Sequence, residues 1–436
     1  MTSVHTHLHG SAGGDHDHHG PDRAFLLRSE NITLAPGAGK GISTALLGAG
    51  VIGIVLAGIG STMIGPLGKA HALASIHVGV MACLAMVLGN LWYVLLQSLV
   101  RAGWSATIRR QQENVATLVP LVGLGVIGVL IADLLLGHPL FTWMNKYQGD
   151  YILEGKAAWL NAPFFYLRVI VYILIWTMLA RRMARLSLEQ DRTGDKWLSA
   201  AAGKTSAWGM LVFALSVAFA AFDLLMSTDF RFFSTMWGVY YFAGSAYSGI
   251  AVCILVTAML RRAGKLEGVV TDEHNHDMGK FLFAFTVFWA YIGFSQYFLI
   301  WYSNIPEETA YMLARKQGGW QVIFYVMAFG HFLAPFILML FRPLKKRPVP
   351  LIIMSLWAIL MHLVDIFWIV RPMVYSGQPG HTTDTIGLGG LWVDVVAIGG
   401  VVAVFAALVI RKVASGPLVA VNDPYMNQSL EHKNYV

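Results

Sequence analysis

The chain has 436 residues, of which 56% are hydrophobic and only 13% are charged. A set of soluble domains could not cover so much apolar surface with so few charges, so the composition excludes it and indicates a polytopic membrane protein. The net charge of +7 collects in short loops, which gives no reason to expect a nucleic-acid partner, and two cysteines are too few for an iron–sulfur site or a disulfide scaffold.

Residues 1–43 are polar, and six of the 15 histidines precede residue 20. This composition predicts a disordered tail, and the tail has no apolar stretch of signal-peptide length. The histidines could hold Zn²⁺ or Ni²⁺, but their spacing fits no closed site, so a solvated tail is the simpler interpretation. They are His5, His7, His9, His16, His18 and His19.

A helix that crosses the bilayer needs about 20 mostly apolar residues. Ten segments meet this requirement, which predicts an all-α protein with a ten-helix membrane domain over residues 44–410 and a second tail over residues 411–436. The segments cover approximately residues 44–65, 73–99, 116–136, 162–180, 207–226, 237–260, 281–302, 320–341, 349–370 and 389–410.

Basic residues alternate strongly between the two sides of this predicted topology. The tails and the loops on their side carry 23 of the 31 lysines and arginines, whereas the loops on the other side carry seven. Because positive charge is retained on the cytoplasmic side, both termini are predicted to be cytoplasmic, in a multi-pass protein of the bacterial inner membrane.

Ionisable side chains at membrane depth are costly, and they usually face a protein interior or a water-filled cavity. By the predicted topology, most of those in this chain lie in the outer half of the membrane. Carboxylates and imidazoles in this position could conduct protons. These residues and the polar side chains near them are therefore candidates for a proton path. The candidates are Asp133, Asp223, Asp229, Tyr291, Ser295, Gln296, His331, His362 and Asp365.

His362 and Asp365 are three residues apart and share a helix face. An imidazole beside a carboxylate can pass a proton because its pKa lies near neutrality, although hydrogen-bonded packing explains the pair equally well. For His77 and Asp394 packing is the favoured interpretation. A haem b site would need two facing imidazoles, and no single-helix pattern argues for one. The sequence therefore assigns no catalytic residue, no metal site and no cofactor ligand.

Two aspartates four segments apart occupy similar depths. Asp223 lies in FAAFDLLMSTDF and Asp365 in MHLVDIFWIVRP. This faint internal repeat predicts two four-helix bundles, formed by helices 2–5 and 6–9, with helices 1 and 10 flanking them.

Two long motifs carry a more specific signal, and they surround several of the proton-path candidates. They are FDLLMSTDFRFFSTMWGVYYFAGS at residues 222–245 and GKFLFAFTVFWAYIGFSQYFLIWYSNIPEET at residues 279–309. Together with all ten segments they resemble the F subunit (ActF) of bacterial alternative complex III, a quinol:cytochrome c oxidoreductase. The wider superfamily is that of NrfD-like, polysulfide-reductase-type membrane subunits, which consist of two four-helix bundles with flanking helices.

The resemblance implies a subunit without its own redox centre that packs against a homologous ten-helix partner (ActC). The other implied partners are an iron–sulfur subunit, c-type haem subunits and, as a further candidate, a haem–copper oxidase, all within membrane lipid. Haem c and iron–sulfur clusters would belong to those partners. The leading hypothesis is a scaffold that also conducts protons.

Two alternatives remain open. In the first, this chain itself binds and oxidises quinol, with Phe285, Trp289, Tyr291 and Tyr297 forming an aromatic cleft and His331 accepting a proton. In the second, the paired bundles form a secondary transporter, although no matched helices are broken by glycine or proline.

Overall fold

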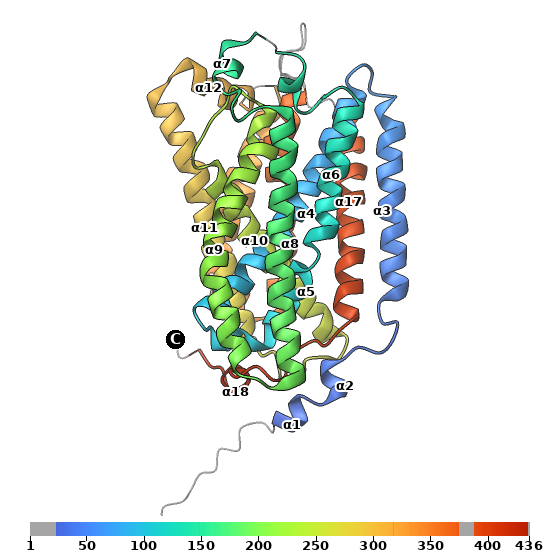
Figure 1. Cartoon of the computed structure of the whole chain (residues 1–436), viewed down its shortest axis with the longest axis vertical. Helices are drawn as coiled ribbons and strands as arrows, with labels where there is room; N and C mark the ends of the chain where they lie inside the picture. Colours follow the sequence, from blue (N-terminus) through green and yellow to red (C-terminus); the bar gives the residue numbers. More distant parts are fainter. Residues whose placement is uncertain (1–22, 148, 317, 375–387, 435–436) are drawn as a thin grey trace, which may run out of the picture.

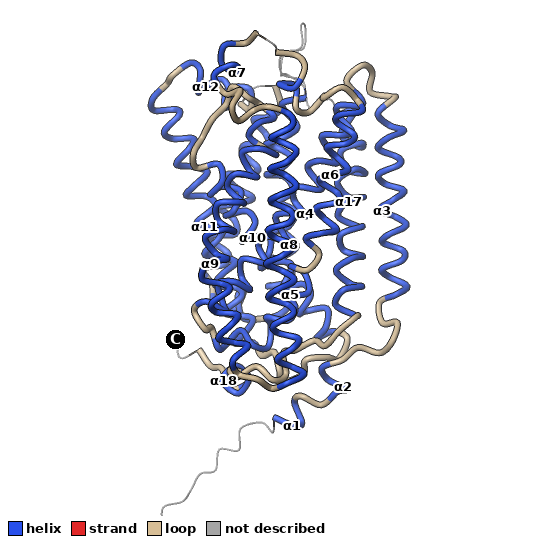
Figure 2. Tube along the Cα trace, viewed as in Figure 1, coloured by secondary structure: helices blue, strands red, loops and turns tan. Residues whose placement is uncertain are grey.

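The computed structural model describes residues 23–147, 149–316, 318–374 and 388–434. All regular elements in these ranges are helices (Figure 2). Ten of the helices are long and apolar enough to cross a membrane, which confirms the predicted all-α polytopic fold.

Most of the spans are single helices. They are α3 (Lys40–Ser61), α4 (Gly68–Leu99), α6 (Val119–Leu135), α8 (Ala162–Thr193), α9 (Trp197–Leu224), α10 (Trp237–Arg262), α11 (Asp272–Ser303), α16 (Pro348–Val370) and α17 (Leu388–Ala414). The eighth span is composite and consists of α13 (Trp320–Val326), the π-helical η4 (Met327–Leu333) and α14 (Ala334–Leu340).

Short helices connect or flank the spans. They are α1 (Arg23–Leu26), α2 (Ser29–Ile32), η1 (Gly103–Ser105), α5 (Ala106–Ala116), η2 (Thr142–Met144), α7 (Tyr151–Gly155), η3 (Met226–Thr228), α12 (Pro306–Ala314), α15 (Arg342–Lys346), η5 (Arg371–Val374) and α18 (Met426–Leu430).

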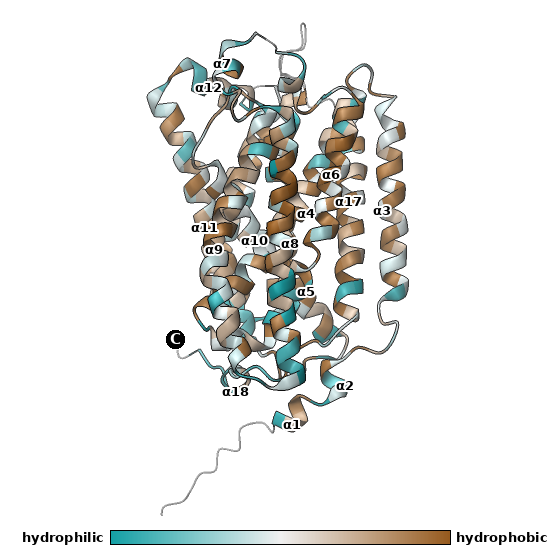
Figure 3. Cartoon of the chain, in the orientation of Figure 1, coloured by the Kyte–Doolittle hydropathy of each residue, from teal (hydrophilic) through white to brown (hydrophobic). Residues whose placement is uncertain are grey.

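The described segments nearest the two termini, α1 and α18, lie at the same end of the molecule, as an even number of crossings requires (Figure 1). We call this the terminal end and the opposite one the distal end. Hydrophobic residues dominate the middle of the helices, whereas hydrophilic residues are frequent at the terminal end, for example on α5 and the last turns of α8 (Figure 3).

The spans form the two predicted bundles. In the first, α4 contacts α6 and α9, and α8 closes the ring by contacting both α6 and α9. In the second, α10 contacts α11 and α16, α11 contacts α14, and α16 contacts α13 and η4. The flanking helices α3 and α17 pack against each other and against α4.

The two bundles meet at a very close crossing of α4 and α10. A Cβ atom added at Gly89 of α4 would lie 1.9 Å from the carbonyl oxygen of Ser245, and one added at Gly249 of α10 would lie 2.8 Å from the backbone of Gly89. Small residues allow such an approach where helices associate within a membrane. The crossing therefore depends on glycine at both positions.

Helix α5 was not predicted, because residues 100–114 were assigned to a cytoplasmic loop. It lies at the terminal end of the first bundle, and Arg110, Gln111, Gln112, Glu113 and Asn114 are all buried. A hydropathy pattern cannot detect a helix whose buried residues are polar. Such a helix is stable only because the fold supplies partners, such as Asp191 of α8, which pairs with Arg110.

Both tails contact the rest of the chain where the structure describes them. Leu26 and Ile32 are buried, and the Asn31 amide donates to the carbonyl oxygens of Leu26 (2.8 Å) and Glu267 (2.9 Å). At the other end of the chain, Asp423 pairs with Arg109 of α5. The histidines predicted to lie in a solvated tail fall outside the described residues.

Candidate functional site

The two aspartates of the predicted repeat lie in separate bundles and have different surroundings. Asp223, on the last turn of α9, is fully buried and faces Arg168 of α8. The Arg168 Nε and Nη2 atoms donate to the Asp223 carboxylate at 2.8 and 2.7 Å, and the Trp159 indole (2.9 Å) and Tyr172 hydroxyl (2.9 Å) donate to it as well.

Asp223 is therefore the partner of Arg168 that the sequence did not identify. A carboxylate has about four acceptor sites, and all four are used here, two of them by a guanidinium. Such a carboxylate has no acceptor position left for a further hydrogen bond. The Asp223–Arg168 pair therefore holds α8 and α9 together at the distal end of the first bundle.

Asp365, on α16 in the second bundle, is 2% exposed. It accepts hydrogen bonds from the Tyr240 hydroxyl (2.5 Å) and the Trp289 indole (3.0 Å). Among the residues that the structure describes, no lysine, arginine or histidine forms an ion pair with it. Burial without a compensating cation favours the protonated form of a carboxyl group.

Two imidazoles accompany this carboxyl group. His331 stacks on the Trp289 ring at a centroid distance of 3.6 Å, and His362 lies one helical turn before Asp365. Both imidazoles are fully buried, and neither has a hydrogen-bond partner on either ring nitrogen within the described chain.

We call Tyr240, Trp289, His331, His362 and Asp365 the buried cluster. Three of its five members were proton-path candidates from the sequence. Buried polar atoms almost always have a partner, so four unpartnered imidazole nitrogens set this cluster apart from an ordinary packed core.

The position of His331 follows from an irregularity in its helix. Pro335 has no N–H group to donate to the His331 carbonyl, and the chain forms the π-helical segment η4 just before it. Within this segment, the Trp357 indole donates a hydrogen bond to the Gly330 carbonyl at 2.7 Å. Single π-helical turns inside α-helices are frequent at functional sites.

An apolar cavity of about 360 Å³ adjoins the buried cluster. Tyr240 and Trp289 line it together with aromatic residues of α11 and α13, and two of these, Tyr291 and Phe294, are each 65% exposed. In a membrane the exposed side of this cavity would face lipid. We refer to it as the aromatic cavity.

The aromatic cavity collects most of the residues predicted for a quinol cleft. Trp289, Tyr291 and Tyr297 line it, and Phe285 does not. Gln296 also lines it and accepts a hydrogen bond from Ser234 at 2.6 Å.

Besides Asp223, three candidates lie outside both the buried cluster and the aromatic cavity. The Ser295 hydroxyl donates to the Tyr291 carbonyl of its own helix at 2.6 Å. Asp133, at the distal end of α6, accepts from the Leu140 backbone N–H (2.8 Å) and contacts His138 (3.0 Å), so it caps a turn. Asp229 follows η3 and lines a different cavity, at the distal end.

This distal cavity has a volume of about 760 Å³ and is lined by residues of both bundles. Its charged lining residues are Lys69, Lys146, Asp229, Arg231 and Arg315. Burial of the Arg315 guanidinium lowers its pKa from the usual value, whereas the nearby Tyr311 hydroxyl and Asp229 carboxylate act in the opposite direction.

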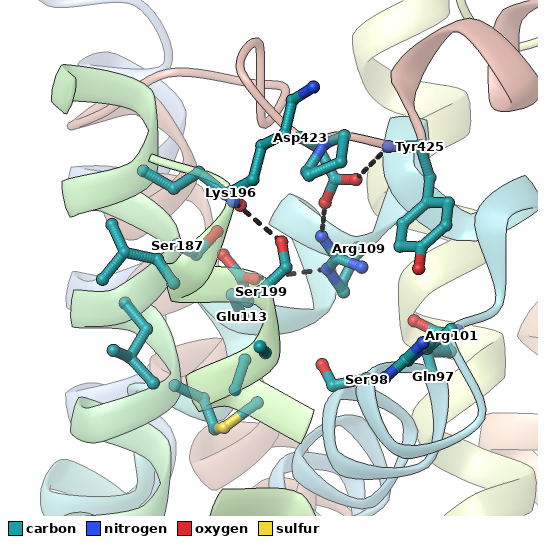
Figure 4. Close-up of a pocket in the computed structure, with 17 residues that line it drawn as sticks. Gln97, Ser98, Arg101, Arg109, Glu113, Ser187, Lys196, Ser199, Asp423 and Tyr425 are labelled. Carbon is teal, nitrogen blue, oxygen red and sulfur yellow. Dashed lines mark hydrogen bonds and ion pairs between the residues drawn. The ribbon is translucent and has the colours of Figure 1, made fainter. Parts of the chain in front are cut away.

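A third cavity, of about 260 Å³, lies at the terminal end between α4, α5, α8, α9 and the C-terminal segment. Figure 4 shows Arg109 in it, between Glu113 and Asp423. Gln97 also lines the cavity, is 2% exposed, and has no described hydrogen-bond partner for either amide atom. The cavity therefore has the polar lining that ordered water requires.

His77, His71 and Asp394 have structural contacts. The His77 Nε2 atom contacts the Leu224 carbonyl at 2.8 Å, which ties α4 to α9. Asp394 of α17 pairs with Arg371 at 2.7 Å and with His71 at 3.1 Å. These contacts agree with the packing roles favoured for His77 and Asp394.

Sequence reasoning missed Tyr240 as a partner of Asp365, and Trp159 and Tyr172 as partners of Asp223. Nothing in the local pattern marks them, because a buried aromatic with a polar tip looks like any other aromatic in an apolar helix. The sequence analysis includes Arg315 only as one of the seven basic residues in the loops on the side opposite the tails.

Comparison of the chain with protein-family models gives no match, and comparison with curated proteins gives none either. Among the described residues, no group of three or more histidine, cysteine, aspartate or glutamate side chains could hold a metal ion. The resemblance to the ActF subunit is thus a prediction that depends on the two sequence motifs.

Proposed function

We propose that this chain is an ActF-like membrane subunit of a bacterial quinol:cytochrome c oxidoreductase, which supports a homologous quinol-binding subunit and conducts protons through its second bundle. The two motifs and the arrangement of helices support the first part of the proposal. The buried cluster supports the second.

One observation carries the proton-conducting role. Asp365 is buried, is bonded only by neutral donors, and lies beside two imidazoles whose nitrogens have no partner within the described chain. A carboxyl group with such neighbours can take up a proton and release it, and imidazole can pass a proton between its two nitrogens. Asp223, by contrast, is fixed by Arg168.

Aromatic residues with polar tips connect the buried cluster with the distal end. Trp237 contacts both Tyr240, at a centroid distance of 5.6 Å, and Tyr311, at 5.8 Å. Tyr311 in turn lines the distal cavity, close to Asp229. These ring contacts lead from the buried cluster toward the distal side, where quinol oxidation in the proposed complex releases its protons.

The assembly is tested by purifying the affinity-tagged chain from its native membrane in a mild detergent. We expect iron–sulfur and c-type haem subunits to co-purify with it in fixed stoichiometry, together with quinol:cytochrome c activity. A chain that purifies alone, or with partners that contain no haem, would refute the respiratory assignment.

A second candidate function, quinol binding by this chain, is favoured by the aromatic cavity. The cavity is apolar, opens toward the predicted lipid side, and shares Tyr240 and Trp289 with the buried cluster. Sites for small apolar ligands are typically concave and aromatic, with a few polar groups that fix orientation. A quinol ring in this cavity would lie next to the hydrogen bonds that hold Asp365.

Filling the aromatic cavity distinguishes the two functions. Ala290→Phe places a large side chain on its lining, whereas Ala284→Phe adds the same bulk at an exposed position of α11 outside the lining. If this chain binds quinol here, the first variant should lose the quinone extracted with the protein and at least about 90% of turnover, since a ring cannot enter a filled pocket. Equal quinone content and turnover in both variants would leave only the scaffold and proton roles.

A further inference from the structure

The distal cavity contains a marked excess of positive charge. Among the residues that the structure describes, four cationic side chains and one carboxylate line it: Lys69, Lys146, Arg231, Arg315 and Asp229. Arg231 is paired with Asp150 at 2.5 Å, which leaves three cations and one acid among the described lining residues. Such a surplus in a confined space attracts anions.

Arg315 is the most unusual of the four cations because it is fully buried. It donates to the carbonyl oxygens of Trp368 (3.1 Å), Tyr311 (3.0 Å) and Ile369 (2.6 Å), and its guanidinium lies 3.4 Å from the Tyr311 ring centroid. Within the described chain, no carboxylate lies within ion-pair distance of it.

The two lysines differ from Arg315 in being exposed. Lys69 lies at the start of α4 and Lys146 in the connection between α6 and α8, and neither forms an ion pair with a described residue. A fixed guanidinium at the base of a cavity and movable ammonium groups at its edge suit a ligand that carries several anionic oxygens.

The other lining residues and the volume of the cavity indicate which further groups the ligand carries. The hydroxyl groups of Thr142 and Tyr147 offer hydrogen bonds, and apolar residues such as Leu136 and Met373 cover other parts of the wall. The volume of about 760 Å³ exceeds what an inorganic anion alone requires and is large enough for a phosphate with an organic group attached.

We propose that the distal cavity binds a phosphate-bearing anion between the two bundles, held by Lys69 and Lys146 and attracted by the positive charge of the buried Arg315. The phosphate could belong to free inorganic phosphate or to the headgroup of an anionic lipid. This inference does not depend on the respiratory assignment or on proton conduction.

The two sources are separated by two measurements on the purified full-length chain. Equilibrium dialysis against radiolabelled inorganic phosphate, with the chain in a non-ionic detergent, measures the free anion. Native mass spectrometry of the chain from nanodiscs that contain phosphatidylglycerol or phosphatidylcholine measures retained lipid. Saturable phosphate binding identifies the free ion, and selective retention of phosphatidylglycerol identifies the headgroup.

The double variant Lys69→Gln, Lys146→Gln tests the location, because both side chains are exposed and their loss leaves the buried contacts intact. We expect a loss of affinity of at least tenfold. The matched control is Lys265→Gln, Lys412→Gln, which removes the same charge at the terminal end and should bind normally. Asp229→Asn removes the single acid of the lining and should bind more tightly.

The proposal is overturned if neither phosphate nor phosphatidylglycerol binds to the wild-type chain. It is also overturned if both double variants weaken binding equally, since the anion would then respond to the net charge of the protein and not to this cavity. Arg315→Gln is a weaker test because Arg315 also holds the ends of α12 and α16, so the lysine variants decide the outcome.

Discussion

Asp223→Asn is expected to destabilise the protein by about 3–5 kcal/mol, because it leaves the buried Arg168 guanidinium without its anion. The carboxylate accepts four hydrogen bonds, two of them from Arg168, and an amide cannot replace both of these. The expected results are a lower midpoint of thermal unfolding in detergent and a smaller yield of folded protein in the membrane.

Two controls separate the buried charge from a general effect of the substitution. Asp150→Asn changes the more exposed pair with Arg231 and keeps a good N-cap for α7, so its cost should stay below about 1 kcal/mol. The double variant Arg168→Met, Asp223→Asn removes both charges while it retains an acceptor for Trp159 and Tyr172. It should recover most of the lost stability, and equal instability of the single and double variants would contradict the ion-pair explanation.

Asp365→Asn has the largest effect expected on function. The amide has nearly the same shape but cannot carry a proton, so turnover of the complex and the number of protons released per quinol should both fall, turnover by about tenfold or more. Loss of one neutral hydrogen bond costs about 1–3 kcal/mol, which the assembled complex should tolerate. Turnover is measured with purified complex, and proton release with the complex in lipid vesicles.

Asp133→Asn is the matched control, because this carboxylate also lies near the distal end of a span but caps a turn away from the buried cluster. It should leave turnover and proton release unchanged. Asp365→Glu restores a titratable group and should recover part of the activity. Normal proton release by Asp365→Asn in an intact complex would exclude the relay and leave the scaffold role alone.

Much of the fold could be predicted because a bilayer imposes one length and one composition on each span. The ten segments follow from that constraint, whereas the two bundles and the flanking position of α3 and α17 were predicted from the faint repeat around Asp223 and Asp365. Helix ends were predicted less well. Helix α8 continues to Thr193, 13 residues beyond the predicted end at residue 180, because a helix of good helix-forming residues does not stop where its apolar stretch stops.

The partners of the candidate-site residues could not be predicted from the sequence. Asp223 and Asp365 look equivalent in the sequence, and only the structure shows that one faces an arginine and the other only neutral donors. Partners come from distant parts of the chain: Asp365 and Tyr240 are separated by 125 positions. Helix α5 was missed for the same reason, since polar side chains are buried only when other elements satisfy them.

The close glycine crossing of α4 and α10 limits how this protein can move. Carriers that alternate between two open states rock one half of the molecule against the other, which requires a surface that can slide or part. Here the two backbones are in van der Waals contact at Gly89 and Gly249, at the centre of the molecule. A contact of this kind argues against a carrier that rocks one bundle against the other, and it agrees with the proposal that protons, which need no such movement, pass through the second bundle.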